Sequence, residues 1–313
     1  MSEAPTPSHW LKSFSHSPTH SFPIQPFTHS AIVKVLYVVI PVFNRWRYTR
    51  ECLESLRRQT SQDFRPIVVD DGSTDETAAA LARDYPEVEV VTGDGQLFWT
   101  AGVNAGIRRA LALGADRVLT LNNDVVAAPD FIAQMLAAAA EQPTAVLGAL
   151  EFDAATGEAI YGGERLDFRT NTRHDLLEEL PAGQRTGLHP VTYLPGRGLL
   201  IPRAVIDKIG LFDEKRLPHY MADFDYTSVA RRAGFPVLCN YAAQLSTYPE
   251  ESGQTLTRRQ RSVRGYFQHL FGIRGGGNMV NFTYFALKNC PKPYLPYFLL
   301  NGYARRLVGY FLH

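Results

Sequence analysis

The sequence contains few cysteines, and this excludes a fold that depends on disulfide bonds. Cys52, Cys239 and Cys290 are the only three in 313 residues, and they lie far apart in the chain. An odd number cannot be fully paired, and the spacing is not that of paired zinc ligands. This content is typical of a protein from a reducing compartment, so we expect a cytoplasmic location.

Long apolar runs are missing too. No stretch reaches the roughly 18 consecutive apolar residues of a membrane-spanning helix. Residues 1–33 are rich in Ser, Pro, Thr and His and have no basic segment followed by an apolar run. They therefore predict a disordered tail rather than a secretory signal. The histidines of this tail are irregularly spaced, which favours solvated coil over metal capture.

Acidic residues are absent from the end of the chain. After Glu251 there is no Asp or Glu, whereas nine Lys and Arg residues and twelve aromatic residues follow. Because the whole chain has a net charge of +1, the rest of it carries −8. We predict a basic, aromatic and helical C-terminal region over residues 251–313.

Two interpretations of this C-terminal region stay open. It binds an anionic membrane surface as a peripheral contact, at the inner face of the cell membrane, or it forms a helical subdomain that packs its aromatic side chains inward. Nucleic acid is not an expected partner, because the chain is nearly neutral and carries no recognition motif.

From residue 34 to residue 250, strand-like and helix-like segments alternate. Runs of apolar and β-branched residues predict strands, and the stretches between them have the periodicity of helices. The predicted strands cover residues 34–42, 65–71, 88–93 and 117–124, and the predicted helices include residues 102–113 and 130–141. Strands that alternate with helices of this length predict an α/β fold with a mostly parallel sheet flanked by helices.

Polar residues follow two of the predicted strands. Asp70 and Asp71 end one strand, and the Asn-Asn-Asp run at residues 122–124 ends another. Ligands of a parallel sheet bind beyond the carboxyl ends of its strands, so both clusters are candidates for a binding site. A carboxylate of the first pair can accept a hydrogen bond from the imide of a pyrimidine base. Asp124 can hold a hard divalent cation together with diphosphate oxygens, although such a turn is often ordinary loop chemistry.

The turn after Asp71 also predicts the start of a helix. Gly72 permits a tight bend, and Ser73 with Glu76 forms a capping-box pattern. We expect Asp75 and Glu76 to cap that helix and to interact favourably with its dipole, which is a structural role.

Six segments together resemble the inverting GT-A glycosyltransferases of family 2. They are VVIPVFNR, VVDDGSTDET, GQLFWTAGVNAGI, LTLNNDV, GRGLLIPRAVIDKIGLFDE and HYMADFDYTSVARRAGF. Their order and spacing match over about residues 34–245. The likeness is greatest to bacterial cell-surface polysaccharide enzymes, which include many rhamnosyltransferases. The resemblance implies a GT-A fold with a Rossmann-like sheet over residues 34–250, followed by the C-terminal helical extension.

The resemblance also implies an activity. One sugar would move from a UDP- or dTDP-linked donor to a hydroxyl of a saccharide or lipid-linked acceptor, with inversion of the anomeric carbon, in cell-surface glycan synthesis. Asp223 is implied as the catalytic base, and Asp124 as the ligand of Mg²⁺ or Mn²⁺. The implied nucleotide-binding residues are Pro41, Val42, Phe43, Asn44, Asp71 and Asn123.

A second group of residues is expected on the substrate side, namely Trp99, Gly196, Arg197, Gly198, Ala222 and Asp225. Trp99 is either a core aromatic residue or a platform on which a sugar stacks. The two glycines would let the backbone approach the sugar or would form an ordinary bend, and Arg197 could meet the diphosphate. Asp225 is either a supporting contact or a solvated helix charge.

The sequence departs from the family pattern at three points. Val229 stands where many relatives carry an arginine, no histidine lies near Tyr248, where many relatives place a metal ligand, and the QxxRW motif of processive members is absent. The last departure favours addition of one sugar over polymerisation.

Other functions fit the sequence less well. The departures leave open a catalytically inert relative that binds a nucleotide sugar or serves as an assembly partner, but the retention of Asp71, Asp124 and Asp223 argues against it. A nucleotidyltransferase would show a glycine-rich phosphate loop near the first strand, and none is present. A dinucleotide oxidoreductase is disfavoured because Phe98 stands where its motif needs the third glycine.

Overall fold

The computed structural model describes residues 35–249 and 262–312. The predicted disordered tail and residues 251–261 of the predicted C-terminal region lie outside the described residues. The described residues belong to one compact unit. The three cysteines are free and buried.

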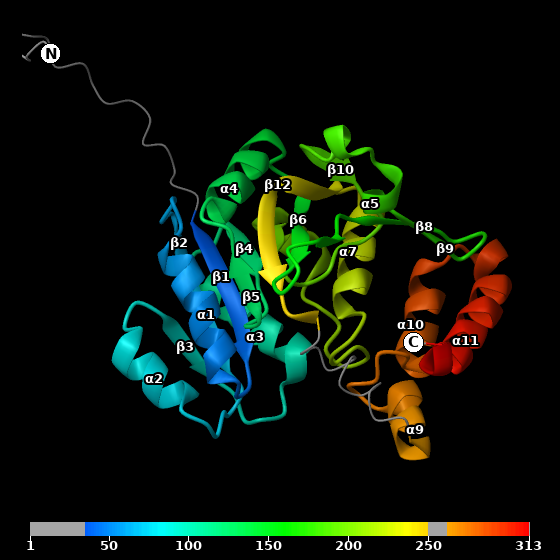
Figure 1. Ribbon diagram of the computed structural model, residues 1–313, viewed down its shortest axis with the longest axis horizontal. Helices are drawn as coiled ribbons and strands as arrows, with labels where there is room; N and C mark the ends of the chain where they lie inside the picture. Colours follow the sequence, from blue (N-terminus) through cyan, green and yellow to red (C-terminus); the bar gives the residue numbers. More distant parts are fainter. Residues whose placement is uncertain (1–34, 250–261, 313) are drawn as a thin grey trace, which may run out of the picture. The chain divides into compact units, whose positions relative to one another are not determined.

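Ten strands form one sheet in the described part of the chain (Figure 1). Their order is β10-β12-β6-β11-β4-β1-β2-β3, with β5 beside β12 and β7 beside β6. The strands are β1 (Leu36–Val42), β2 (Phe64–Asp70), β3 (Glu89–Thr92), β4 (Arg117–Thr120), β5 (Val125–Ala127), β6 (Val146–Asp153), β7 (Ala159–Tyr161), β10 (Leu188–Pro190), β11 (Leu199–Pro202) and β12 (Val237–Thr247). A separate pair comprises β8 (Glu164–Asp167) and β9 (Thr172–Asp175).

The sheet is mostly parallel, as predicted. β1 pairs in parallel with β2 and β4, β2 with β3, and β6 with β12. β11 lies antiparallel between β4 and β6. The carboxyl ends of β1, β2 and β4 therefore open at one edge, as expected for the two polar clusters.

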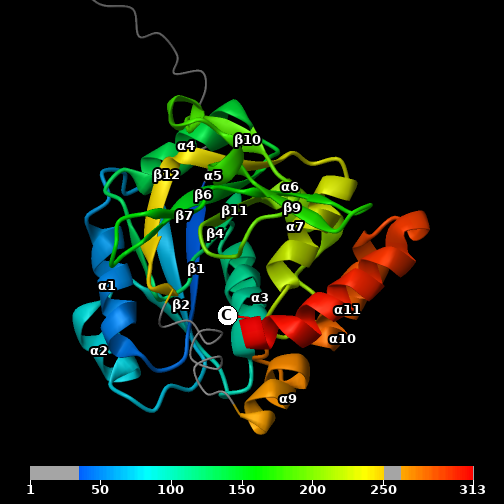
Figure 2. The ribbon, with the colours of Figure 1, turned by 45° about the vertical axis from the view of Figure 1, so that its right-hand side comes forward.

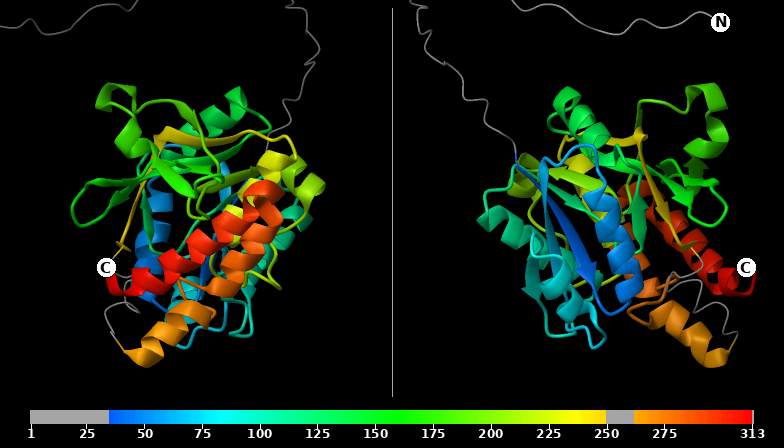
Figure 3. Two further views of the ribbon diagram at one scale, coloured as in Figure 1. Left: turned by 90° about the vertical axis from the view of Figure 1, so that its right-hand side faces the viewer. Right: turned by 60° about the vertical axis from the view of Figure 1, so that its left-hand side comes forward.

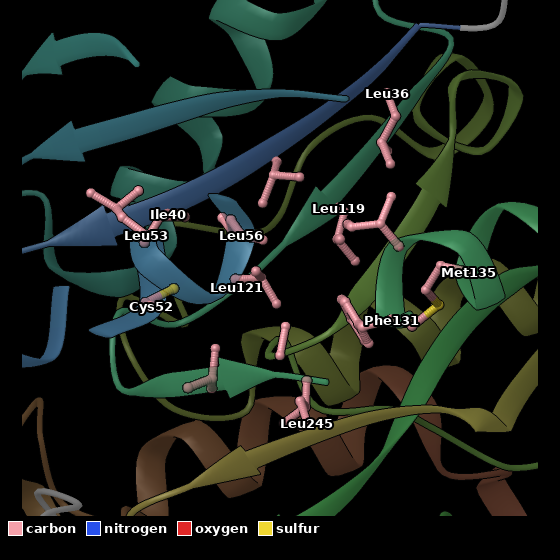
Figure 4. Packing of buried hydrophobic residues seen from close by; sticks show 14 of the residues in the cluster. Leu36, Ile40, Cys52, Leu53, Leu56, Leu119, Leu121, Phe131, Met135 and Leu245 are labelled. Atoms are coloured by element: carbon pink, nitrogen blue, oxygen red, sulfur yellow. The ribbon is translucent and has the colours of Figure 1, made fainter. Parts of the chain in front are cut away.

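Helices cover both faces of this sheet (Figure 3). Alternate residues of β1 enter different cores, because successive side chains of a strand point to opposite faces. Leu36 and Ile40 join the core that includes side chains of α1 (Trp46–Arg57), α2 (Thr77–Asp84) and α4 (Phe131–Glu141) (Figure 4). Tyr37 and Val39 join the core on the other face, which includes side chains of α3 (Phe98–Ala112), α6 (Arg203–Ile209) and α7 (Ala222–Arg232). The short elements α5 (Leu176–Glu179) and η1 (Ala182–Gln184) follow β9.

Two predicted helix starts differ from the structure. The capping box at the start of α2 is wrong: Ser73 Oγ accepts instead from Asn44 N at 2.7 Å, and Glu76 makes no side-chain cap. Asp75 does act locally as expected, since its Oδ1 accepts from Thr77 N at 3.0 Å. α3 begins at Phe98 rather than near residue 102. Its first turn is fixed to the segment that precedes α7, because Thr100 Oγ1 donates to Leu217 O at 2.6 Å and Thr100 N donates to Pro218 O at 3.1 Å.

The C-terminal region is helical, as predicted. It contains α9 (Val263–Phe271), α10 (Met279–Asn289), η3 (Lys292–Tyr294) and α11 (Leu295–Leu312), and α10 lies beside α7 (Figures 1 and 2). Phe282, Phe285 and Phe298 form a small core of their own, against which Phe224 of α7 packs. Among the described helices, none has the length and apolar character needed to cross a membrane.

Candidate active site

Asn44 joins the loops that follow β1 and β2. Its backbone has a φ of 57°, a left-handed conformation that Asn tolerates better than most residues. Its side-chain Oδ1 accepts from Thr74 N at 2.7 Å, and its own N donates to Ser73 Oγ. The two loops therefore form one connected wall at the carboxyl edge of the sheet.

Asp71 closes the loop after β3 onto the end of β2. Its Oδ1 accepts from Gly95 N at 2.8 Å, and its Oδ2 accepts from Leu97 N at 3.0 Å. The residue is 7% exposed. Each carboxylate oxygen has a further lone pair, so Asp71 can still accept a hydrogen bond from a ligand. The predicted contact with a base stays a prediction, and the structure adds the role of holding residues 93–97.

The other predicted nucleotide-binding residues differ in what they present. Phe43 is 43% exposed beside Asn44, whereas the side chain of Val42 lies in the core and leaves only its backbone for a ligand. Pro41 is half-buried. Asn123 turns toward α1, because its Nδ2 donates to Thr49 Oγ1 at 3.0 Å.

Trp99, in the first turn of α3, connects this helix with the loop after β4. Its Nε1 donates to Asn122 Oδ1 at 2.9 Å, and its ring meets the edge of Phe212 with centroids 5.7 Å apart. The side chain is half-buried, so it is not a fully enclosed core residue. The ring also occupies the space that a side chain at position 196 would need, since a Cβ there would lie 2.2 Å from Trp99 Cζ2.

The turn before β11 is anchored at both glycines. Gly196 N donates to Asp223 Oδ2 at 2.9 Å, and the carbonyl oxygen of Gly196 accepts from Thr120 Oγ1. Gly198 has a φ of 75°, which a side chain would disfavour, and its N donates to Thr120 O at 2.9 Å. The turn is therefore fixed to both β4 and α7.

Asp223 lies in the first turn of α7 and faces this anchored turn. Its Oδ1 accepts from Phe224 N at 2.9 Å, and its Oδ2 accepts from Gly196 N. Burial raises the pKa of the Asp223 carboxyl, while these backbone donors and the charge of Arg197 lower it to a smaller extent. A carboxylate whose pKa is raised toward neutrality is better suited to accept a proton.

Arg197 interacts electrostatically with three carboxylates, those of Glu151, Asp124 and Asp223. Burial lowers the pKa of its guanidinium, but the charges of Glu151, Asp124 and Asp223 outweigh that effect, so the pKa is raised. The two acidic residues predicted for metal binding and catalysis thus lie near the same guanidinium. Asp71 is connected to this group indirectly. It accepts from Leu97 N, and Trp99, two residues later, packs its ring against Gly196.

Asp124 is the predicted metal ligand, and the structure places it against Arg45. Arg45 Nη1 lies 3.4 Å from Asp124 Oδ2, and its guanidinium stacks over the ring of Tyr48 at 4.6 Å. In the described residues no group of three or more His, Cys, Asp or Glu side chains could hold a metal ion. The side chain of Asp124 is 16% exposed. This donor set fits a hard cation whose other ligands are diphosphate oxygens and water, and it does not fit a site made by the protein alone.

Glu151 is a site residue that sequence analysis missed. It lies on β6 with no exposed surface, and its Oε2 accepts from Arg197 Nε at 2.6 Å. Its Oε1 has no hydrogen-bond partner among the described residues. Burial raises the pKa of the Glu151 carboxyl, against the lowering effect of Arg197. Its position within an apolar strand could have identified Glu151 from the sequence, because a buried carboxylate requires a charged or hydrogen-bonding partner.

The remaining predicted residues of α7 do not open onto the turn. Ala222 is 1% exposed and lies in the core. The interpretation of Asp225 as a solvated charge is wrong: it is 1% exposed, Lys288 Nζ lies 2.5 Å from its Oδ2, and Asn289 Nδ2 donates to its Oδ1 at 2.8 Å. Asp225 therefore supports the helix that carries Asp223 by fixing it to α10.

Replacing Gly196 by alanine is expected to lower the free energy of unfolding by about 1–3 kcal/mol, because the new methyl group would force the Trp99 ring to move. In a Trp99→Leu background the same change should cost much less, since the ring is gone. Urea unfolding of the wild type, both single variants and the double variant measures this coupling. An equal cost in both backgrounds would contradict the proposed steric conflict.

Replacing Glu151 by alanine is expected to lower kcat/KM of the reaction at this site by about ten- to a hundredfold, because Arg197 loses a charge-assisted hydrogen bond. Glu151→Gln keeps an acceptor oxygen and should restore most of that loss. Steady-state kinetics of both variants, with melting temperatures as a check on folding, makes the comparison. If the glutamine variant were as impaired as the alanine variant, positioning of Arg197 would not be the reason.

Comparison with known sequences gives a consistent match. The family model described as "Glycosyl transferase family 2" matches residues 37–210. A curated relative, the N-acetylglucosaminyl-diphospho-decaprenol L-rhamnosyltransferase of Mycobacterium tuberculosis, is 28% identical over 228 residues, which are 64% of this chain and 72% of the relative.

Two solved structures are similar in fold. TarS 1-349 of S. aureus in complex with UDP-GlcNAc aligns with a TM-score of 0.58 at 15% identity, over 88% of this chain and 72% of that chain. GalNAc-T7 with UDP, GalNAc and Mn²⁺ aligns with a TM-score of 0.57 at 14% identity, over 89% of this chain and 57% of that chain. At these identities the likeness concerns the fold alone. The chain spans little more than half the length of the GalNAc-T7 chain.

Proposed function

Because the chain belongs to glycosyl transferase family 2 and has the GT-A fold, we propose that it transfers one sugar, with inversion, from a nucleotide diphosphate sugar to a hydroxyl of a saccharide or lipid-linked acceptor. The observation that carries this proposal is the arrangement at the turn before β11. There Asp223 is fixed by two backbone donors, and Arg197 lies near both Asp124 and Asp223.

The nucleotide end of the donor is assigned to the wall formed by the loops after β1, β2 and β3. Asp71 would accept the imide N–H of uracil or thymine through a lone pair that its contacts with Gly95 and Leu97 leave over. The exposed ring of Phe43 lies beside this wall and offers an apolar face to the nucleoside. Because uracil and thymine present the same imide, UDP and dTDP donors both remain candidates.

The diphosphate is assigned to the space near Arg197 and Asp124. Arg197 would donate to phosphate oxygens while Glu151 holds its Nε, which fixes the direction of the guanidinium. Asp124 would hold Mg²⁺ or Mn²⁺ together with diphosphate oxygens, and such a cation neutralises the charge that builds on a departing diphosphate. The Mn²⁺ in the GalNAc-T7 structure supports this assignment by analogy of fold.

Asp223 is assigned the role of general base. It would take the proton from the acceptor hydroxyl as the hydroxyl oxygen attacks the anomeric carbon, while the bond from that carbon to the diphosphate oxygen breaks. A single displacement of this kind inverts the anomeric carbon and needs no covalent sugar intermediate, unlike a retaining hydrolysis with two close carboxyl groups.

A lipid-linked saccharide is the acceptor that we propose, in the synthesis of a cell-surface glycan. The name of the relative from M. tuberculosis identifies a rhamnosyl transfer to a diphospho-decaprenol-linked sugar. The basic and aromatic C-terminal region of this chain is compatible with such an acceptor, because its aromatic and cationic side chains suit the headgroup level of a membrane.

The test is a panel of UDP- and dTDP-linked sugars, incubated with the protein, Mn²⁺ and a crude lipid-linked acceptor extract. We expect one donor to yield a product that carries a single added sugar of inverted configuration. A wild-type protein that binds a nucleotide sugar but transfers none from the whole panel would favour the catalytically inert alternative.

A further inference from the structure

Exposed apolar side chains concentrate in the C-terminal helices. Among the described residues, sixteen large hydrophobic side chains are exposed, and twelve of them lie between positions 263 and 311. A soluble protein seldom gathers so many apolar side chains on adjoining helices unless the surface binds something. The small core of Phe282, Phe285 and Phe298 accounts for other aromatic residues of the region, but not for these twelve.

α11 has two distinct apolar faces. One face turns inward: Phe298 is 2% and Tyr310 is 3% exposed. The opposite face turns outward and carries Tyr297, Leu300, Leu307, Val308 and Phe311, with exposed fractions between 43% and 71%. Spacings of three, four, seven and eight residues place these five side chains on one side of a helix. The outward face therefore forms an apolar stripe along the helix.

α9 continues this stripe. Val263, Phe267 and Phe271 are 77%, 58% and 54% exposed and follow one another at intervals of four residues. Tyr266 connects the helices, because its ring centroid lies 5.1 Å from that of Phe311 and 6.1 Å from that of Phe267. We call these three side chains of α9 and the five outward side chains of α11 the docking face.

We propose that the docking face binds the surface of an anionic lipid bilayer. The charge of the segment supports this occupant, since no acidic residue follows Glu251 and nine basic residues do. Arg264 lies where α9 meets the end of α11, next to Val263, and Lys292 lies just before α11; both are exposed and have no ion-pair partner within the described residues. Amphipathic helices with apolar and basic side chains settle at the headgroup level, where phosphate meets the cations and acyl chains meet the rings.

A second copy of the chain suits this face less well. A symmetric dimer would place the same surface on both partners, so two positively charged segments would face each other. A bilayer with anionic headgroups supplies the opposite charge and the apolar depth together.

The docking face is connected to the helix that carries the proposed base through α10, whose Phe282 ring stacks on Phe298 of α11. Lys288 and Asn289 of α10 both bond to Asp225 of α7, two residues from Asp223. Arg305 of α11 donates to Asn171 O at 2.8 Å, which fixes that helix to the loop after β8. Membrane binding would also bring a lipid-linked acceptor toward α7, and this part of the inference rests on the proposed function.

The test is co-sedimentation of the full chain with vesicles of phosphatidylcholine alone or mixed with phosphatidylglycerol. We expect binding to the mixed vesicles that weakens with added salt. Leu300→Ser and Phe267→Ser should each weaken it by about tenfold, and Arg264→Gln by about fivefold. Val90→Ser removes an apolar side chain of 40% exposure on β3 and should leave vesicle binding unchanged. Melting temperatures show that the variants fold.

Several outcomes would overturn the proposal. They are equal binding to neutral and mixed vesicles, no binding to either, or unchanged binding of Leu300→Ser. A lipid-free dimer in sedimentation velocity that Leu300→Ser dissociates would assign the face to a second copy. Vesicle binding is measured without transfer, so a protein that binds vesicles but transfers no sugar contradicts only the proposed function. Transfer to a water-soluble acceptor with no vesicle binding contradicts only the docking face.

Discussion

Replacing Asp223 by asparagine is expected to reduce sugar transfer by about 10²–10⁴-fold, because the acceptor hydroxyl loses the group that takes its proton. Donor binding should persist, since the nucleotide is assigned to Asp71 and the loops after β1 to β3. Isothermal calorimetry with UDP or dTDP, next to initial rates of transfer, separates the two effects. Asp223→Asn with wild-type activity would remove Asp223 from the role of base.

The same variant tests the pH dependence. Burial holds the pKa of Asp223 above the ordinary value of an aspartate, which is about 3.9. The base acts only when deprotonated, so kcat/KM should fall as the pH decreases through this raised pKa. The acidic limb should therefore lie above the range of an exposed aspartate and should be absent from the residual activity of Asp223→Asn.

A matched control is needed because the asparagine also changes a structural contact. Both oxygens of Asp223 accept backbone hydrogen bonds, and the amide nitrogen of an asparagine would face one of these donors. Asp207→Asn makes the same chemical change on the surface of α6, where the side chain is 57% exposed and pairs with Arg203. Asp207→Asn should keep full activity. A similar loss in both variants would point to a general effect on folding.

The strands were predictable because their apolar runs are local signals. The strands predicted at residues 65–71 and 117–124 correspond to β2 and β4, although β4 ends four residues earlier than predicted. The order of the predicted strands along the chain was enough to predict the parallel sheet. The start of α2 was not predictable in the same way. Ser73 Oγ could accept either from the start of α2 or from Asn44, and only the fold brings Asn44 N close enough to donate to it.

The acidic residues of the candidate site were predicted from the ends of the predicted strands and from the family resemblance, whereas their mutual arrangement was not predictable. Asp124 and Asp223 are separated by about a third of the chain, and the guanidinium near both belongs to Arg197, on a turn between them. Glu151 was missed because its importance depends on the placement of β6 near the turn that precedes β11. The sequence left a solvated charge open for Asp225 because its partners lie on α10, more than sixty residues later.

Replacing Asp124 by asparagine is expected to remove the effect of Mn²⁺ on nucleotide diphosphate binding and to lower transfer by about a hundredfold or more. Asp124 is the one acidic side chain that the family resemblance assigns to the cation. Asparagine keeps the shape of the side chain but lacks the negative charge that a hard divalent cation requires. Calorimetric titration of UDP with and without Mn²⁺ measures the effect independently of turnover.

Two further variants make this result specific to the charge at position 124. Arg45→Gln removes the guanidinium group whose Nη1 lies 3.4 Å from Asp124 Oδ2. It should retain the Mn²⁺ effect, because the carboxylate is then more available to the metal. Asp130→Asn changes an aspartate whose carboxylate accepts from Gln134 Nε2 at 3.0 Å and should behave like the wild type. If Asp124→Asn still bound UDP more tightly in the presence of Mn²⁺, the cation would be held elsewhere, and the assignment of Asp124 would be wrong.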